Sequence, residues 1–210
     1  MSTSGGGGLN ALLYVAVIVA GVRTGLRSRG TDLEDVLRRP PPAALALWAV
    51  VAIPSLLQVP FPALLTHLQR DPDRIADGEL WRLVTSAVTQ DGGVFGTVVN
   101  LVALGVVAPV AVAVLGGLRT WVVFTVAVVA FDLAVITWSP TVGAGNSAAT
   151  LALAAAVVSV VATRRRLVPV AAVLACGAAL LLLRDAHGEA VLGGLVLGAV
   201  AAQSRASTVR

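Results

Sequence analysis

Long apolar runs separated by short polar segments dominate the chain. Runs of about 17 to 25 apolar residues are long enough to cross a bilayer as helices. Seven such runs cover approximately residues 9–26, 42–59, 93–115, 118–138, 145–162, 167–183 and 186–202. Glycine is frequent within them, as is usual where transmembrane helices pack closely. The pattern predicts an all-α polytopic membrane helix bundle, with one N-terminal transmembrane helix followed by six more.

Two of the polar connections are longer than a tight turn. Residues 60–92 mix apolar side chains such as Phe61, Leu80 and Trp81 with acids and arginines, which predicts an amphipathic loop in the membrane interface. Within it, we expect Trp81 and Arg82 to anchor the loop, the arginine by bonding backbone carbonyls. Residues 31–39 predict a short surface helix capped by Thr31 or Asp32.

Composition excludes a soluble protein. The mean hydropathy is +0.90, and 57% of residues are hydrophobic but only 12% charged, against roughly a quarter charged in soluble domains. The net charge of +4 comes from 15 arginines scattered over the connections, so no basic patch for nucleic acid is expected. The bias towards arginine, alanine, valine and glycine suggests a bacterial origin.

The arginines predict how the bundle is oriented. If the N-terminus lies outside and the C-terminus in the cytoplasm, eleven arginines fall on the cytoplasmic side, and Arg70, Arg74, Arg82 and Arg184 fall outside. This bias is typical of a multi-pass protein of the plasma (inner) membrane. Residues 1–8 carry no positive charge, so we expect the first apolar run to be retained rather than cleaved as a signal peptide.

For two isolated residues within the apolar runs we expect a structural rather than a chemical role. The single cysteine, Cys176, offers no disulfide or metal spacing and is interpreted as a packing thiol. Asp132 is an intramembrane carboxylate, for which we expect a hydrogen-bonded or protonated structural role. We expect neither a metal nor a cofactor.

Two short motifs carry the candidate chemistry. Gly143–Ala148 contains Ser147, and the segment beginning at His187 lies 40 residues further on. Both open apolar runs at the predicted outer face, so Ser147 and His187 are candidates for nucleophile and base. Glu189 is two positions from His187 and is expected on a different helical face. No other carboxylate is evident, so we expect a dyad.

Candidate donors for an oxyanion are the backbone N–H of Ser147, at a helix N-terminus, and the side-chain amide of Asn100. Each residue also has a structural interpretation on its own. Ser147 could cap or pack a helix, His187 could be an interfacial histidine, and Asn100 could bond a neighbouring helix.

Taken together, these motifs resemble the rhomboid family of intramembrane serine proteases over roughly residues 42–202. The segments that carry the resemblance are Glu79–Ser86, Asn100-Leu101, Ala108-Pro109, Leu115-Gly116, Gly145–Ala148, and His187 with Ala190 and Gly194. The resemblance implies a six-helix rhomboid-like membrane domain over residues 42–210. Residues 1–41 would form the extra transmembrane helix and a cytoplasmic linker.

The chain departs from the family pattern at several positions. Gly96 stands where the family usually has a histidine, and Ala148 replaces a glycine. A second family histidine would fall at Gln90 or Asp91, and an acidic residue at Val112. Thr97 and Gln90 are candidates to compensate for the donor missing at Gly96.

The resemblance implies a Ser-His protease that cleaves transmembrane-helix substrates near the outer membrane face. The alternative is a catalytically inactive pseudoprotease that binds transmembrane clients, which Gly96 and Ala148 favour. A small transporter is disfavoured, because the chain shows no inverted repeat.

Overall fold

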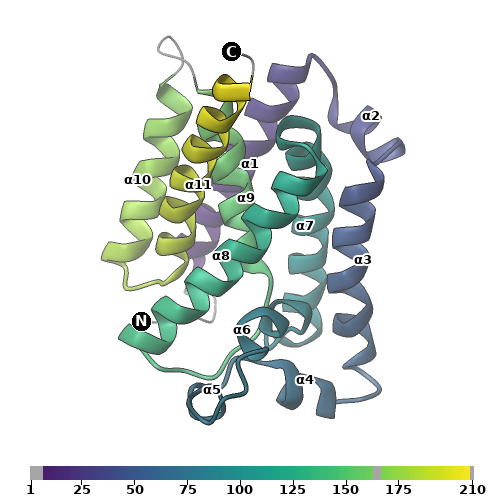
Figure 1. Ribbon diagram of the computed structural model, residues 1–210, viewed down its shortest axis with the longest axis vertical. Helices are drawn as coiled ribbons and strands as arrows, with labels where there is room; N and C mark the ends of the chain where they lie inside the picture. The colour runs from purple at the N-terminus through teal and green to yellow at the C-terminus, as the bar shows by residue number, and fades with distance from the viewer. Residues whose placement is uncertain (1–6, 163–166, 209–210) are drawn as a thin grey trace.

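The computed structural model describes residues 7–162 and 167–208 and is all-helical over that part of the chain. Seven helices correspond to the seven predicted runs and stand side by side in Figure 1. They are α1 (Gly8–Arg29), α3 (Pro42–Leu57), α7 (Gly93–Leu115), α8 (Gly117–Trp138), α9 (Ser147–Val161), α10 (Val168–Leu182) and α11 (His187–Thr208).

Membrane-length helices confirm the class of protein. By length and composition, α1, α7 and α8 could each cross a bilayer, while α3, α9 and α10 are apolar but shorter. A helix of 15 residues, such as α9, extends about 22 Å, less than the hydrocarbon thickness of about 30 Å. The chain is therefore a membrane protein, and the count of seven full spans stays a prediction.

Helix α9 forms the centre of the bundle. It is buried along its whole length from Ala148 to Val158, as expected for a helix that is apolar on every face. Glycines of its neighbours allow this close packing. A Cβ added at Gly194 of α11 would lie 2.4 Å from Ala152 O, and one at Gly21 of α1 would lie 2.6 Å from Ala154 O.

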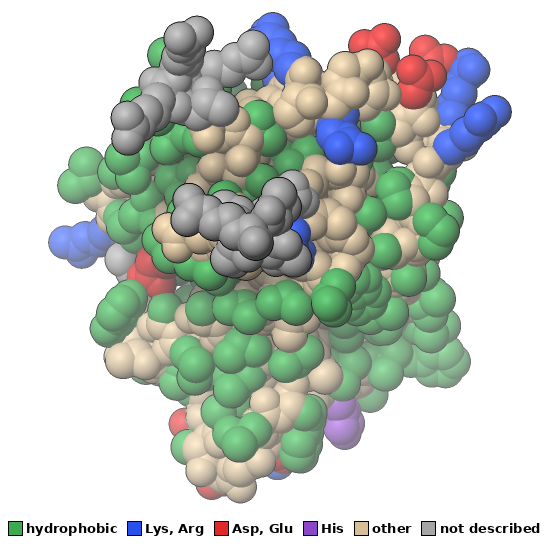
Figure 2. Space-filling model, turned by 45° about the horizontal axis from the view of Figure 1, so that its top comes forward, with side chains coloured by type: hydrophobic (Ala, Val, Ile, Leu, Met, Phe, Trp, Pro, Cys, Tyr) green, Lys and Arg blue, Asp and Glu red, His purple; other side chains and the backbone are tan. Residues whose placement is uncertain are grey.

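Lipid-facing surface surrounds this core. Large apolar side chains are exposed around the bundle, for example Leu12, Val94 and Leu182 at 68%, 73% and 85%. Figure 2 shows hydrophobic side chains over much of the visible surface, with arginines and acids gathered towards its edges. Exposed apolar area of this extent is what a bilayer covers.

The short helix α2 (Leu33–Arg38) confirms the predicted surface helix. It begins after Asp32, but the Asp32 side chain makes no capping hydrogen bond. An exposed ion pair between Arg38 and Glu34, at 2.5 Å, links its first and last turns.

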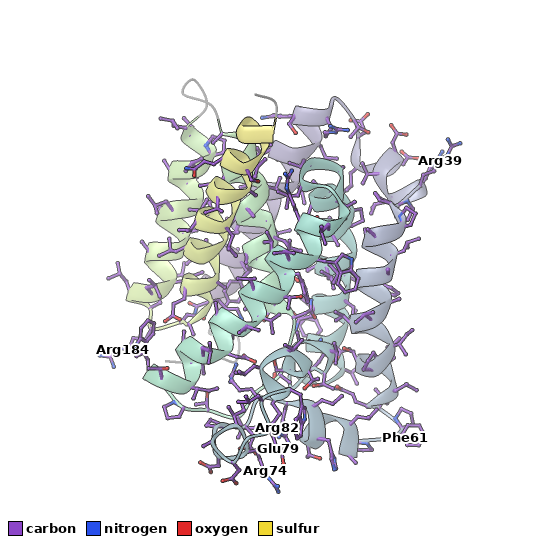
Figure 3. The ribbon with its side chains drawn as sticks, in the orientation of Figure 1. Arg39, Phe61, Arg74, Glu79, Arg82 and Arg184 are labelled. Atoms are coloured by element: carbon purple, nitrogen blue, oxygen red, sulfur yellow. The ribbon has the colours of Figure 1, made fainter. Side chains whose placement is uncertain are left out.

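The connection between α3 and α7 folds into short helices at the end of the bundle where α9 begins. They are α4 (Ala63–Leu68), α5 (Pro72–Ala76), α6 (Arg82–Thr85) and the 3-10 helix η1 (Ser86–Val88). Arg82 is buried, pairs with Glu79 at 2.6 Å, and donates to the carbonyls of Thr66 and Gln69. The predicted bonds from Arg82 to backbone carbonyls are confirmed, and anchoring of the loop at the membrane interface stays a prediction. Figure 3 shows Arg82 and Glu79 at the opposite end of the molecule from Arg39.

Candidate active site

Ser147 and His187 meet where two helices begin. Ser147 is the first residue of α9 and His187 the first residue of α11. Because these two helices pack closely along their length, their N-terminal residues meet at one end of the bundle. Ser147 Oγ lies 2.8 Å from His187 Nε2, and His187 is 3% exposed. The two predicted residues are therefore within hydrogen-bond distance.

A third residue, Asp185, lies against the other imidazole nitrogen. Its Oδ1 is 2.8 Å from His187 Nδ1 and accepts the backbone N–H of His187 at 3.0 Å. The expectation that no carboxylate accompanies the histidine is wrong. Helical spacing correctly separated Glu189 from the imidazole, but Asp185 precedes the helix. An aspartate often bonds the backbone N–H two residues ahead, and this was the signal available in the sequence.

The backbone before Asp185 explains how the carboxylate reaches the imidazole. Arg184 has φ = 59°, in the left-handed region that non-glycine residues rarely adopt. This residue turns the chain sharply between α10 and α11. Such strained positions persist only where the surroundings hold them, and they occur often at functional sites.

Two side chains of α1 complete the surroundings of Asp185. Asn10 Nδ2 donates to Asp185 Oδ2 at 2.6 Å, and Tyr14 Oη donates to the same oxygen. Tyr14 Oη also lies 3.1 Å from His187 Nδ1, and the two rings are 4.9 Å apart between centroids. Neither residue is predicted from the sequence, because nothing local links α1 to a turn about 170 positions further along the chain.

Ionisation of Asp185 follows from these contacts. Burial raises the pKa of this carboxyl, but the hydrogen bond and charge of His187, with the bond from Tyr14, outweigh burial and lower the pKa to about 2. The group is therefore a carboxylate at neutral pH, a suitable acceptor for an imidazole N–H.

A small polar pocket lies beside the serine and the histidine. It has a volume of about 20 Å³, which is enough for about one water molecule. One wall is Phe131, whose ring centroid lies 5.4 Å from that of His187. Asp132 also lines this pocket, pairs with Arg70 at 2.6 Å and accepts a hydrogen bond from Ser86 at 2.6 Å. The hydrogen-bonded role expected for Asp132 is confirmed.

The two predicted oxyanion donors lie close to this pocket. A Cβ added at Gly145 would be 3.5 Å from Asn100 Nδ2 and 3.9 Å from Ser147 Oγ. Asn100 Nδ2 donates to Gln90 Oε1 at 2.8 Å, which uses one of its two protons. The backbone N–H of Ser147 stands at the N-terminus of α9, where the helix dipole favours negative charge.

The candidates to compensate for Gly96 are engaged elsewhere. Gln90 Nε2 donates to Ser55 Oγ and Asn146 Oδ1, so both of its amide protons are used. Thr97 Oγ1 donates to the carbonyl of Gly93 in its own helix. Gln90 instead orients Asn100, a role that the sequence did not signal.

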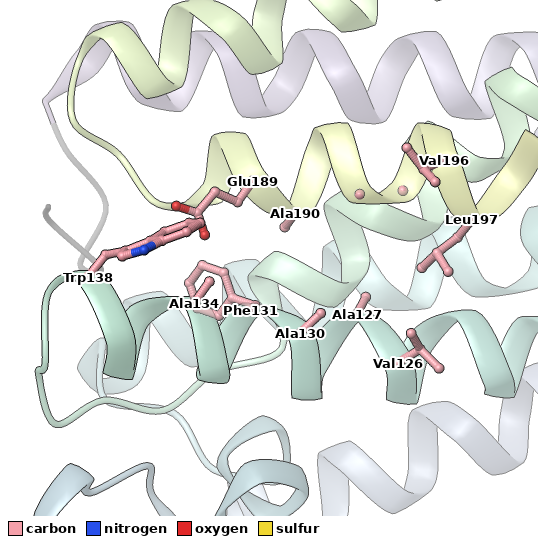
Figure 4. Close-up of a pocket in the computed structure, with 12 residues that line it drawn as sticks. Val126, Ala127, Ala130, Phe131, Ala134, Trp138, Glu189, Ala190, Val196 and Leu197 are labelled. Carbon is pink, nitrogen blue, oxygen red and sulfur yellow. The ribbon is translucent and has the colours of Figure 1, made fainter.

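An apolar groove of about 390 Å³ runs between α8 and α11 and is shown in Figure 4. It begins beside Trp138 and Phe131 and continues past Ala130 towards Leu197. Glu189 lies at its Trp138 end (Figure 4). The groove shares Phe131 with the small polar pocket.

Comparison with known proteins identifies a domain family. The family model described as Rhomboid domain matches residues 77–205. No curated protein and no solved structure matches the chain significantly. The matched region contains Asn100, Ser147, Asp185 and His187, whereas α1 and α3 lie outside it.

Proposed function

The chain belongs to the rhomboid family, and we propose that it is an intramembrane serine protease with Ser147 as nucleophile and His187 as general base. The single observation that carries this proposal is the 2.8 Å contact between Ser147 Oγ and His187 Nε2. A serine hydroxyl is a weak nucleophile unless a base removes its proton. Here the base is in contact with the hydroxyl, and a carboxylate is in contact with the base.

The reaction follows from this geometry. Neutral His187 accepts the proton of Ser147 at Nε2 while Oγ attacks the carbonyl carbon of the scissile peptide bond. The oxyanion receives hydrogen bonds from the backbone N–H of Ser147 and the amide of Asn100. His187 returns the proton to the leaving amine as the C–N bond breaks. Water then hydrolyses the acyl-enzyme by the same route, with His187 again as base.

The architecture proposed with this function is a six-helix rhomboid-like domain over residues 42–210, preceded by a transmembrane helix and linker in residues 1–41. The protein spans the plasma membrane several times, with its N-terminus outside. Ser147 and His187 then lie towards the outer face. Its substrates are transmembrane helices cleaved near their outer ends.

A second candidate function is a pseudoprotease that binds transmembrane clients without cleaving them. Gly96 favours it, because the family histidine is absent there and the two candidate replacements, Gln90 and Thr97, are engaged in other bonds. Loss of one oxyanion donor typically costs about 10²–10³ in rate, which slows catalysis without abolishing it.

Labelling by a fluorophosphonate probe tests the proposal. We expect the purified full-length protein in detergent to be labelled, and Ser147→Ala and His187→Ala to lose the label. Ser159→Ala is a matched control, because Ser159 lies on the same helix, about 18 Å from Ser147 along the helix axis. It should label like the wild type.

The opposite outcome is equally informative. If the folded wild-type protein stays unlabelled beside an active rhomboid treated in parallel, Ser147 is not an activated nucleophile. The client-binding function would then be favoured.

A further inference from the structure

Helix α1 lies outside the matched domain and yet is held firmly against it. Gly21 packs on Ala154 of α9, as described above. A Cβ added at Gly25 would lie 2.4 Å from Val110 Cγ1 of α7. These two close approaches fix the depth of α1 in the bundle, and they set the height at which its N-terminal turns meet the α10–α11 turn.

The N-terminal turns of α1 present two polar side chains to one carboxylate. Asn10 and Tyr14 are four residues apart and therefore share a helical face. Both donate to Asp185 Oδ2, whereas Oδ1 faces the Nδ1 and backbone N–H of His187. Each carboxylate oxygen of Asp185 thus accepts hydrogen bonds from its own pair of donors. Asp185 is 1% exposed and Asn10 is 7% exposed.

We infer that Asp185, Asn10 and Tyr14 are positioning residues that hold His187 in the tautomer with its proton on Nδ1. Helix α1 therefore contributes two of the residues on which catalysis depends. This inference rests on the proposed protease function. Asp185 accepts the Nδ1 proton and leaves the Nε2 lone pair directed at Ser147 Oγ. Asn10 and Tyr14 fix the carboxylate by supplying bonds to its second oxygen, which would otherwise be buried without a partner.

The position of the proton on the imidazole distinguishes this role from simple packing. A neutral imidazole has one N–H, and the bond made by one nitrogen decides which nitrogen carries the proton. If the tautomer is wrong, Nε2 carries the proton and is unable to accept one from the serine. In a Ser-His-Asp site, replacing the aspartate by asparagine preserves geometry and still costs about 10⁴ in kcat for this reason.

Nitrogen-15 NMR of histidine-labelled protein reads the tautomer directly. The chain has two histidines, so His67→Gln assigns both signals. We expect wild-type His187 to be protonated on Nδ1 at a pH where the ring is neutral. Asp185→Asn and Tyr14→Phe should each shift the population towards the Nε2–H form. Tyr14→Phe removes a single oxygen and keeps the ring beside that of His187, so it tests the inference even if Asp185→Asn fails to fold.

Kinetics provide the second measurement. Tyr14→Phe and Asn10→Leu should each lower kcat about 10- to 100-fold, because each loses a hydrogen bond to a charged group. Asp185→Asn should lower kcat by about 10⁴. KM should stay unchanged, because none of the three lines the pocket beside Ser147. Ser28→Ala, which removes a hydroxyl at the far end of α1, is the matched control and should match wild type.

The outcomes distinguish the two proposals. If wild-type His187 carries its proton on Nε2, or if Tyr14→Phe and Asn10→Leu leave both tautomer and kcat as in wild type, the positioning role is overturned. If the tautomer depends on Tyr14 and Asp185 but Ser147 never reacts with the fluorophosphonate, the positioning role stands and the protease function falls.

Discussion

The carboxylate of Asp185 is buried and yet ionised, and its contribution to the stability of the folded protein therefore depends on pH. Burial alone favours the neutral acid. The contacts with His187, Tyr14 and the backbone outweigh burial and lower the pKa from 3.8 to about 2. A carboxyl whose pKa is lowered by folding stabilises the folded state wherever it is ionised.

This stabilisation should be lost in acid. The folded pKa lies below the unfolded value, so the contribution is complete above about pH 4 and disappears as the pH falls towards 2. The difference between 3.8 and about 2 corresponds to about 2 kcal/mol. Thermal unfolding in detergent, followed by circular dichroism between pH 5 and 2, compares wild type with Asp185→Asn. The stability difference between them should shrink over that range, and a difference that stays constant would contradict the lowered pKa.

The same residues show how far the sequence predicts the site. Ser147 and His187 were predicted because each begins an apolar run on the same side, and helix packing brings such ends together. Asp185 was not predicted as part of the site, because its position depends on the left-handed backbone at Arg184. Tyr14 and Asn10 approach it only through tertiary packing of α1, for which a single sequence carries no local signal.

Among the helices, the pair α9 and α11 controls the distance between nucleophile and base. Gly194 and Gly198 face Ala152 and Ala156, where a Cβ would lie 2.4 Å and 2.5 Å from backbone oxygens. Such small residues permit close approach between membrane helices. Any side chain at these positions must push α11 away from α9 and thereby move His187 relative to Ser147.

Two adjacent glycines provide a matched test of this contact. Gly194→Ala should destabilise the protein by about 1–3 kcal/mol through overpacking and should slow fluorophosphonate labelling of Ser147. At Gly193 a Cβ would meet no described heavy atom within 4 Å. Gly193→Ala should therefore be neutral or stabilising by up to about 1 kcal/mol through helix propensity. Unfolding and labelling rates measure both effects, and equal behaviour of the two variants would rule out the close contact.

Helix boundaries were more predictable than the structure of the connections. The run predicted over residues 93–115 coincides with α7, because glycines bound a segment that is apolar apart from Thr97 and Asn100. Helix α9 begins later than predicted, since Gly145 has φ = 148° and belongs to the loop. The short helices between residues 63 and 88 were predicted only as an amphipathic loop, because bonds such as those of Arg82 to distant carbonyls determine them.

For the whole molecule, the proposed orientation depends on where the arginines lie along the chain. Of the four arginines assigned to the outer side, Arg70 is buried against Asp132 and Arg82 against Glu79. Arg74 also lies 3.5 Å from Glu79. These pairs accommodate the arginines at that end of the bundle, but the positive-inside bias counts arginines near the ends of the spans and not net charge. The proposed orientation therefore rests on eleven arginines predicted on the cytoplasmic side against these four.

Cysteine labelling tests this orientation. In a Cys176→Ala background, Phe61→Cys places a thiol at an exposed position, 60% accessible, at the end of the bundle that holds the candidate site (Figure 3). Leu37→Cys places one on α2, 41% exposed, at the other end (Figure 1). A membrane-impermeant maleimide applied to intact cells should label Phe61→Cys, and label Leu37→Cys only after permeabilisation. The reverse pattern would place Ser147 at the cytoplasmic face, and substrates would then have to be cleaved near their inner ends.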